Sequence, residues 1–437
     1  MESKTPRRRR RGRMPDDILN NRDLAAAISI LPANYNFEVH KTVWKLRDAE
    51  PPAKKVALQL PEGLLMFACV IGDIIERFTG ASFVVLGDVT YGACCVDDLT
   101  AQAIGCDYLV HYGHSCLVPV NQMGTNGSLL EDSSKSSLDK HEASLLASTG
   151  TADTAIPLRT LYVFVEIAID VEHLVACVTT NFGARPEQPI TIMGTVQFGP
   201  AVHVASERLV AGGFTDVLVP QAKPLSRGET LGCTAPRLVS ASPASGQADG
   251  TDGVHMPPRD GILIFVADGR FHLEAAMIHN PQLAAYRYDP YGKVLTRERY
   301  AVGQMKTIRL AAINQAKEAP RWGIILGTLG RQGNPAIISH LRKTLRRHGR
   351  RSMLVLLSEV FPAKLALFRD VDAWVQVACP RLSIDWGAAF EKPLLSPYEA
   401  LVALGETEWR EVYPMDYYAS GSGPWTNFHH QSRAFTS

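Results

Sequence analysis

The sequence lacks several features that would assign its class at once. It contains no run of the roughly 18 apolar residues that a membrane span requires. No apolar segment follows the basic run at 7–13, as a secretory signal would need. Basic and acidic residues almost balance, 45 against 44, so no overall charge favours nucleic acid. We therefore expect a cytosolic protein with no membrane or direct nucleic-acid partner, although the basic run leaves a nuclear pool open.

The chain also has few cysteines, and they are irregularly spaced. Eight among 437 residues do not make the dense pattern of a small disulfide-stabilised scaffold. The Cys-x-x-Cys pattern is absent, which argues against a zinc ribbon, a thioredoxin site or a local ferredoxin motif. Any metal must therefore be held by residues that are remote from one another in sequence.

Short apolar runs instead alternate with helical patterns from about residue 51 onward, which predicts parallel sheets with right-handed crossovers. Three stretches resemble one another, with an apolar run, a glycine, and a second glycine before a helix: 84–93, 190–200 and 324–335. Such self-similarity indicates triplication of one module. The alternative is that any α/β chain shows strand–glycine–helix turns. We predict an α/β fold of three similar Rossmann-like domains with parallel-rich sheets.

The pattern gives five segments. Residues 1–50 are a basic disordered tail with a helical lead-in, and residues 411–437 are a C-terminal tail. The three α/β domains are expected at 51–160, 161–259 and 260–410, with strands at Leu161–Val165 and Ile262–Val266 opening the second and third. Residues 121–155 and 240–259 are rich in small polar residues and are predicted to be mobile inserts.

Three cysteines occupy similar places in these units. Cys94, Cys233 and Cys379 each follow an apolar run, and they are 139 and 146 residues apart. Sites in α/β folds form where the strands end, so one thiol from each unit suggests a shared metal. Three thiolates without an obvious fourth ligand suit a [4Fe–4S] cluster with one open iron, and zinc with a water is the competing occupant. Cys95 could replace Cys94, and simple packing of buried thiols is the other interpretation.

Longer motifs then identify a family. The motifs run over 87–98, 111–116, 232–236, 268–272, 288–291, 326–333 and 377–387. Together they resemble the diphthamide biosynthesis protein 1 family, subunit 1 of the eukaryotic 2-(3-amino-3-carboxypropyl)histidine synthase. The resemblance covers roughly Leu31 to Trp425.

The resemblance implies three domains in a pseudo-three-fold triangle around one [4Fe–4S] cluster, held here by Cys94, Cys233 and Cys379. It implies radical chemistry on S-adenosylmethionine, whose 3-amino-3-carboxypropyl group is transferred to the imidazole C2 of a histidine in elongation factor 2. Strand-end position and motif likeness place five residues near the cofactor pocket: Asp268, Gly269, His272, Asp289 and Gln332. The sequence assigns no catalytic acid or base.

The same resemblance implies partners. They are a related second subunit in a heterodimer, a small metal-binding protein that delivers electrons, and elongation factor 2 as the protein substrate. An alternative function is a cluster-binding scaffold that docks elongation factor 2 while the partner subunit carries out the chemistry.

Overall fold

The structure is a computed structural model that describes residues 13–88, 92–113, 158–240, 254–256 and 261–429. The chain divides into two compact units. Unit 1 comprises residues 1–89, 98–112 and 120–165, and unit 2 comprises residues 90–97, 113–119 and 166–437. The predicted insert 121–155 lies outside the described residues, as do the basic residues 7–12. The predicted division into three domains stays a prediction.

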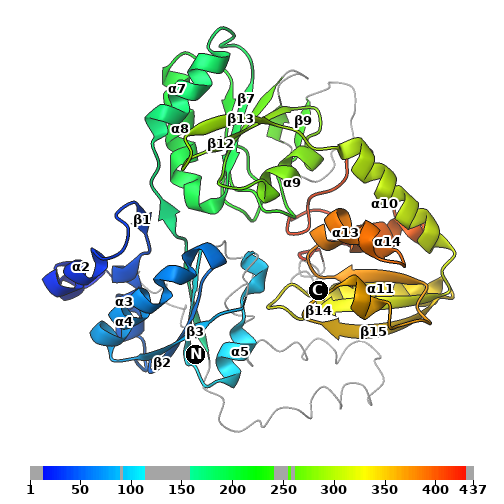
Figure 1. Cartoon of the computed structure of the whole chain (residues 1–437), viewed down its shortest axis with the longest axis horizontal. Coiled ribbons are helices and arrows are strands. Elements are labelled where there is room, and N and C mark those ends of the chain that lie inside the picture. Colours follow the sequence, from blue (N-terminus) through cyan, green and yellow to red (C-terminus); the bar gives the residue numbers. More distant parts are fainter. Residues whose placement is uncertain (1–12, 89–91, 114–157, 241–253, 257–260, 430–437) are drawn as a thin grey trace, which may run out of the picture. The chain divides into compact units, whose positions relative to one another are not determined.

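Unit 1 is built on a parallel sheet in the order β3-β2-β4-β5. The inner strands β2 (Lys55–Gln59) and β4 (Tyr108–Tyr112) are almost wholly buried, as their continuous apolar runs predict. The flanking strands are β3 (Ser82–Leu86) and β5 (Arg159–Val163). The helices are α1 (Asp16–Leu19), α2 (Arg22–Ile28), α3 (Val39–Arg47), α4 (Ala68–Thr79) and α5 (Asp98–Ala103) (Figure 1).

Two strands lie in a different sheet from the one that their position in the sequence predicted. β5 covers most of the strand expected to open the second domain, yet it pairs with β4 in the first sheet. β11 (Ile262–Val266) was expected to open the third domain, yet it lies between β7 (Ile190–Gly194) and β12 (Ala284–Asp289) in a second sheet. Periodicity identifies a strand from its own residues, whereas packing between distant segments decides which strands pair with it. These two assignments were therefore wrong.

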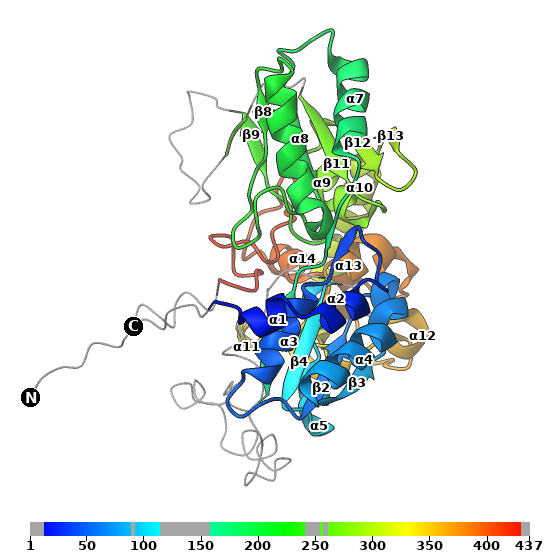
Figure 2. The same cartoon turned by 90° about the vertical axis from the view of Figure 1, so that its left-hand side faces the viewer.

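Unit 2 contains the second sheet, in the order β13-β12-β11-β7-β8. Its strands are β7 (Ile190–Gly194), β8 (Val217–Leu218), β11, β12 (Ala284–Asp289) and the antiparallel edge strand β13 (Val294–Glu298). Helices α7 (Val171–Phe182) and α8 (Gly199–Ala211) run side by side in Figure 2, and α8 contacts β7. Helix α9 (Phe271–His279) follows β11.

The third sheet also belongs to unit 2 and has the order β15-β14-β16-β17, all parallel. Its strands are β14 (Arg321–Gly327), β15 (Arg351–Leu357), β16 (Ala373–Val377) and β17 (Leu394–Leu395). β16 is fully buried, whereas the edge strand β15 is largely exposed. The helices are α10 (Val302–Lys317), α11 (Pro335–Arg347), α12 (Pro362–Leu365), α13 (Arg381–Trp386) and α14 (Pro397–Ala403).

Two segments predicted to be irregular have structure. Within the expected insert 240–259, β10 (Val254–Met256) pairs with β9 (Leu238–Ser240) in parallel, so that segment is not wholly a loop. The expected C-terminal tail packs into the core of unit 2, where Tyr413, Tyr418 and Trp425 are buried. Its aromatic side chains supply apolar area that a solvated tail lacks.

Helices in the part of the chain that the structure describes are too short or too polar to cross a lipid bilayer.

Candidate metal centre

Four cysteine thiols come together in unit 2, and three of them are the predicted ligands. Cys94 and Cys95 lie in a short 3₁₀ turn, Ala93–Cys95, which belongs to unit 2 although its neighbours in sequence belong to unit 1. Cys233 follows β8 by a loop, and Cys379 lies two residues beyond the end of β16. Cys95 and Cys233 are buried, and Cys94 and Cys379 are partly exposed. The structure brings the three distant cysteines close enough for their charges to interact, with Cys95 beside them.

The thiols are close enough to influence one another's ionisation. A hydrogen bond with Cys95 is the largest cause that raises the pKa of Cys94, followed by burial and by the charges of Cys95, Cys379 and Cys233. Burial raises the pKa of Cys379 to about 11 and raises that of Cys233 further. As free thiols these groups stay protonated at neutral pH. A bound metal group would compensate the negative charge of the thiolates, so this soft donor set suits a thiophilic metal.

No three His, Cys, Asp or Glu side chains among the described residues lie close enough together to hold a single metal ion. Three thiolates on one zinc ion, with Zn–S bonds of about 2.3 Å, would have to crowd around one point. In a [4Fe–4S] cluster each cysteine binds a different iron, so the sulfurs stand farther apart. Thiols that interact electrostatically without sharing one ligand sphere are therefore compatible with a cluster.

The segment carrying Cys94 is held by the glycine-rich loop that follows β14. Gly330 has a positive φ of 56°, and a Cβ there would lie 2.5 Å from the carbonyl carbon of Cys95, so only glycine allows this approach. The Arg331 N–H donates to the Cys94 carbonyl at 2.8 Å. The Gln332 side-chain amide lies 3.4 Å from the Cys95 sulfur. The glycine-rich loop thus contacts the cysteine turn.

The other two cysteine loops are fixed by neighbouring polar groups. The Gln376 amide donates to the Cys379 carbonyl at 3.0 Å, and Gln376 itself is buried in β16. The Thr234 hydroxyl lies 3.8 Å from the Cys233 sulfur, and the Tyr417 N–H donates to the Cys233 carbonyl at 3.3 Å. These bonds restrain the backbone around both thiols.

Two tyrosines complete the surroundings, and sequence reasoning missed them. Tyr417 and Tyr418 are buried, and burial is the main cause that raises the pKa of each. Cys94, Cys233 and Cys379 all contribute to both shifts, so the two tyrosines lie at the thiols. The available signal was the aromatic density of residues 413–428, which is unusual for a solvated tail.

The five predicted pocket residues lie in different settings. Gln332 is buried beside Cys95, as described above. Asp268 and Gly269 are exposed just beyond the end of β11, and His272 is in the first turn of α9 with its ring against Phe271. Asp289 accepts hydrogen bonds from the backbone N–H groups of residues 291 and 292, which is a turn-capping role. Their part in binding a cofactor stays a prediction.

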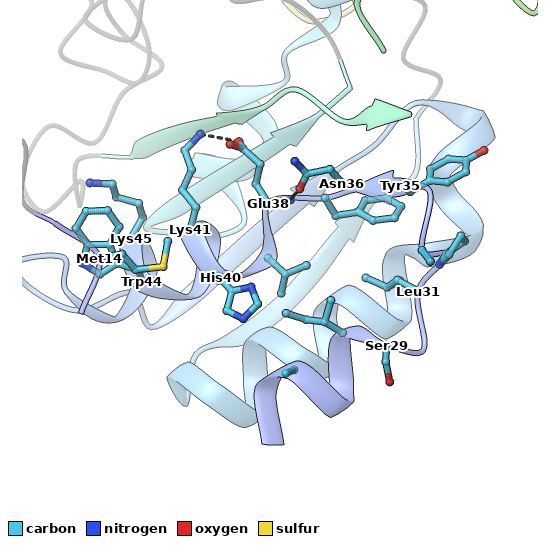
Figure 3. A pocket seen from close by; sticks show the side chains of 16 residues that line it. Met14, Ser29, Leu31, Tyr35, Asn36, Glu38, His40, Lys41, Trp44 and Lys45 are labelled. Carbon is cyan, nitrogen blue, oxygen red and sulfur yellow. Dashed lines mark hydrogen bonds and ion pairs between the residues drawn. The ribbon is translucent and has the colours of Figure 1, made fainter. Parts of the chain in front are cut away.

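A separate hollow of about 1030 Å³ lies in unit 1 and is lined by residues of α2, of the short strand β1 (Tyr35–Asn36) and of α3 (Figure 3). Its lining is mostly apolar, including Leu31, Tyr35 and Trp44. An ion pair between Lys41 and Glu38, 2.5 Å long, lies at its edge. It contains none of the cysteines.

Comparison with known proteins gives the same family as the motifs. The family described as "Putative diphthamide synthesis protein" matches residues 60–129 and 140–414. The protein named 2-(3-amino-3-carboxypropyl)histidine synthase subunit 1 from Gallus gallus is 52% identical over 97% of this chain and 90% of its own length. The human protein of the same name is 49% identical over 98% of this chain and 86% of its own.

The fold is also known from a more distant structure. The crystal structure of Dph2 from Pyrococcus horikoshii with a 4Fe-4S cluster matches 89% of this chain and 95% of its own, with a TM-score of 0.62 and 24% identity. That similarity shows the fold alone. The extent of the family match and the identity to its curated members show that the chain belongs to the diphthamide synthesis family, beside the proteins named subunit 1.

Proposed function

We propose that this chain is a subunit of an enzyme that transfers a 3-amino-3-carboxypropyl group from S-adenosylmethionine to the imidazole C2 of a histidine in elongation factor 2. The gathering of Cys94, Cys233 and Cys379 at one place in unit 2 carries the proposal, since their spacing in the sequence is otherwise unexplained. The relatives' names give the activity, and the distant archaeal structure contains a 4Fe-4S cluster.

The three thiols would hold a [4Fe–4S] cluster. Bound there, the cluster would supply the electron that cleaves S-adenosylmethionine into methylthioadenosine and a 3-amino-3-carboxypropyl radical. The chain's own part is to hold the thiols in place, through Gln376, Thr234 and the Gly330 loop, and to limit water around them with Tyr417 and Tyr418. A dry, fixed surrounding protects a reactive radical from side reactions.

The proposal includes three Rossmann-like domains arranged around the cluster, each providing one cysteine. It also includes a related second subunit in a heterodimer, a small metal-binding electron donor, and a cytosolic location. The word subunit in the relatives' names supports the heterodimer.

Alanine variants of the three cysteines test the ligand assignment. Each would be produced anaerobically with the second subunit, and we would measure iron content, the visible absorption spectrum and the mass of elongation factor 2 after reaction. Cys94→Ala, Cys233→Ala and Cys379→Ala should each lose the cluster. Cys69→Ala is the matched control, because Cys69 is an exposed thiol on α4 of unit 1.

Three outcomes would change the proposal. Full iron content in all three variants would overturn the ligand assignment. Loss of the cluster in Cys95→Ala, with the cluster retained in Cys94→Ala, would move one ligand by a residue. If the cluster disappears while elongation factor 2 is still modified, the chain would instead be a docking scaffold.

A further inference from the structure

Arg381 connects the segments that carry two of the three candidate ligands. It lies in the first turn of α13, two residues after Cys379, and its side chain is 3% exposed. Nη1 donates to the carbonyl of Gly232 at 3.3 Å, directly before Cys233, and to the carbonyl of Phe271 at 2.8 Å. A single planar side chain therefore joins the loop of Cys379 to the loop of Cys233 and to the start of α9.

The remaining donors of Arg381 are bound to carboxylates. Nη2 donates to Glu274 Oε2 at 2.6 Å, and Nε donates to the two oxygens of Asp385 at 2.8 and 3.0 Å. Four of the five guanidinium N–H groups are thus engaged within the protein. A guanidinium committed in this way is a positioning group and is not available to grip a substrate carboxylate.

The packing around the guanidinium is equally tight. Its central carbon lies 4.3 Å from the centroid of the Phe271 ring, in a cation–π contact. A Cβ at Gly232 would lie 2.0 Å from the Phe271 ring, so the loop of Cys233 rests directly on that ring. The stack of Gly232, Phe271 and Arg381 fixes the Cys233 loop against the Cys379 loop.

Arg381 also acts on the sulfurs themselves. Its backbone N–H donates a hydrogen bond to the Cys379 thiol, and its positive charge lies within electrostatic range of both Cys379 and Cys233. Charge and hydrogen bonds around the sulfurs set the reduction potential of an iron–sulfur cluster.

We infer that Arg381 is a positioning residue that clamps the Cys233 and Cys379 loops together and raises the reduction potential of the group bound between them. The inference rests on the proposed function, because it takes the cysteines to hold a [4Fe–4S] cluster. Neighbouring positive charge favours the reduced, more negative cluster, whereas the carboxylates bonded to Arg381, those of Glu274 and Asp385, oppose it.

The test is the midpoint potential of the cluster, measured by dithionite titration of the anaerobic heterodimer with electron paramagnetic resonance of the reduced state. Arg381→Met removes the charge and should shift the potential downward. Glu274→Gln keeps the hydrogen-bonding shape, removes the opposing charge, and should shift it upward. General loosening of the fold would not produce shifts of opposite sign.

Two further variants separate charge from geometry. Arg381→Lys keeps the charge but cannot hold both carbonyls and both carboxylates at once. It should leave the potential near that of the wild type while the cluster is lost to a chelator several-fold faster. Arg309→Met is the matched control, since Arg309 is another buried arginine paired with a glutamate, Glu399. It should leave the potential unchanged.

The outcomes distinguish this inference from the proposed function. A wild-type heterodimer with no cluster bound by this chain refutes both. A normal cluster whose potential is unmoved in Arg381→Met and Glu274→Gln, or moves in one direction in both, refutes the role of Arg381 alone. If Arg381→Met fails to fold, the upward shift in Glu274→Gln decides the question.

Discussion

The buried ion pair between α10 and α14 gives the sharpest stability prediction. Arg309 and Glu399 are both 0% exposed, and the guanidinium donates to the two carboxylate oxygens at 2.6 and 2.7 Å. The carboxylate also accepts from the Tyr413 hydroxyl at 2.9 Å and from the Ser396 N–H at 2.8 Å, which caps α14. Removing the glutamate leaves a buried, uncompensated cation.

Glu399→Leu should therefore cost about 3–5 kcal/mol for the broken pair and about 1 kcal/mol for the lost cap. The double variant Arg309→Met/Glu399→Leu removes both charges, so it should recover most of the pair cost but not the cap. Glu399→Gln keeps the shape and the cap and isolates the effect of charge.

Hydrogen exchange followed by mass spectrometry is the suitable assay, because a protein of two units need not unfold in one step. Breaking the pair in Glu399→Leu should lower the free energy of local opening around α10 and α14 by about 3–5 kcal/mol. Peptides covering these helices should then exchange roughly 100- to 4,000-fold faster. A double variant that exchanges as fast as, or faster than, Glu399→Leu would refute the idea that the unpaired charge is the source of the loss.

Three further predictions concern packing and pH. Gly387→Ala would place a Cβ 2.1 Å from Nη1 of Arg309, whose guanidinium Glu399 holds through Nε and Nη2, and should cost roughly 1–3 kcal/mol; if the same change costs as much in an Arg309→Met background, the clash is not its cause. Gly323→Ala would put a Cβ 2.2 Å from the buried Trp374 ring, so a similar loss is expected in thermal unfolding, and an unchanged midpoint would contradict it. Burial lowers the pKa of His279 below 6.5; as pH falls through 6.5 the unfolded chain binds a proton that the folded chain does not, so stability should fall. His279→Gln should weaken this dependence of stability on pH. If the variant depends on pH as strongly as the wild type, another group causes the effect.

The sequence predicted individual strands more accurately than the order in which the strands pair. Runs such as Ile190–Met193 and Ala373–Val377 are buried strands as expected, because apolar continuity and a following glycine or turn are local signals. The sheet of β5 could not be predicted, because strand order depends on packing between distant segments.

The site shows the same limit. Cys94, Cys233 and Cys379 were found because a soft thiol after an apolar run has a recognisable chemistry, and they do converge. Arg381 has no such signal, since its importance appears only when α9 and the Cys233 loop are seen beside it. Tyr417 and Tyr418 were hidden for the same reason, within a segment that looked like a tail.

The distance in sequence between the converging thiols has a consequence for how the protein matures. During translation, Cys94 emerges 285 residues ahead of Cys379, and no short peptide contains even two of the three predicted ligands. An inorganic group that needs all three can be inserted only after the C-terminal part of unit 2 has left the ribosome and packed against the cysteine turn. Chains truncated before Cys379 would consequently lack one of the three proposed ligands.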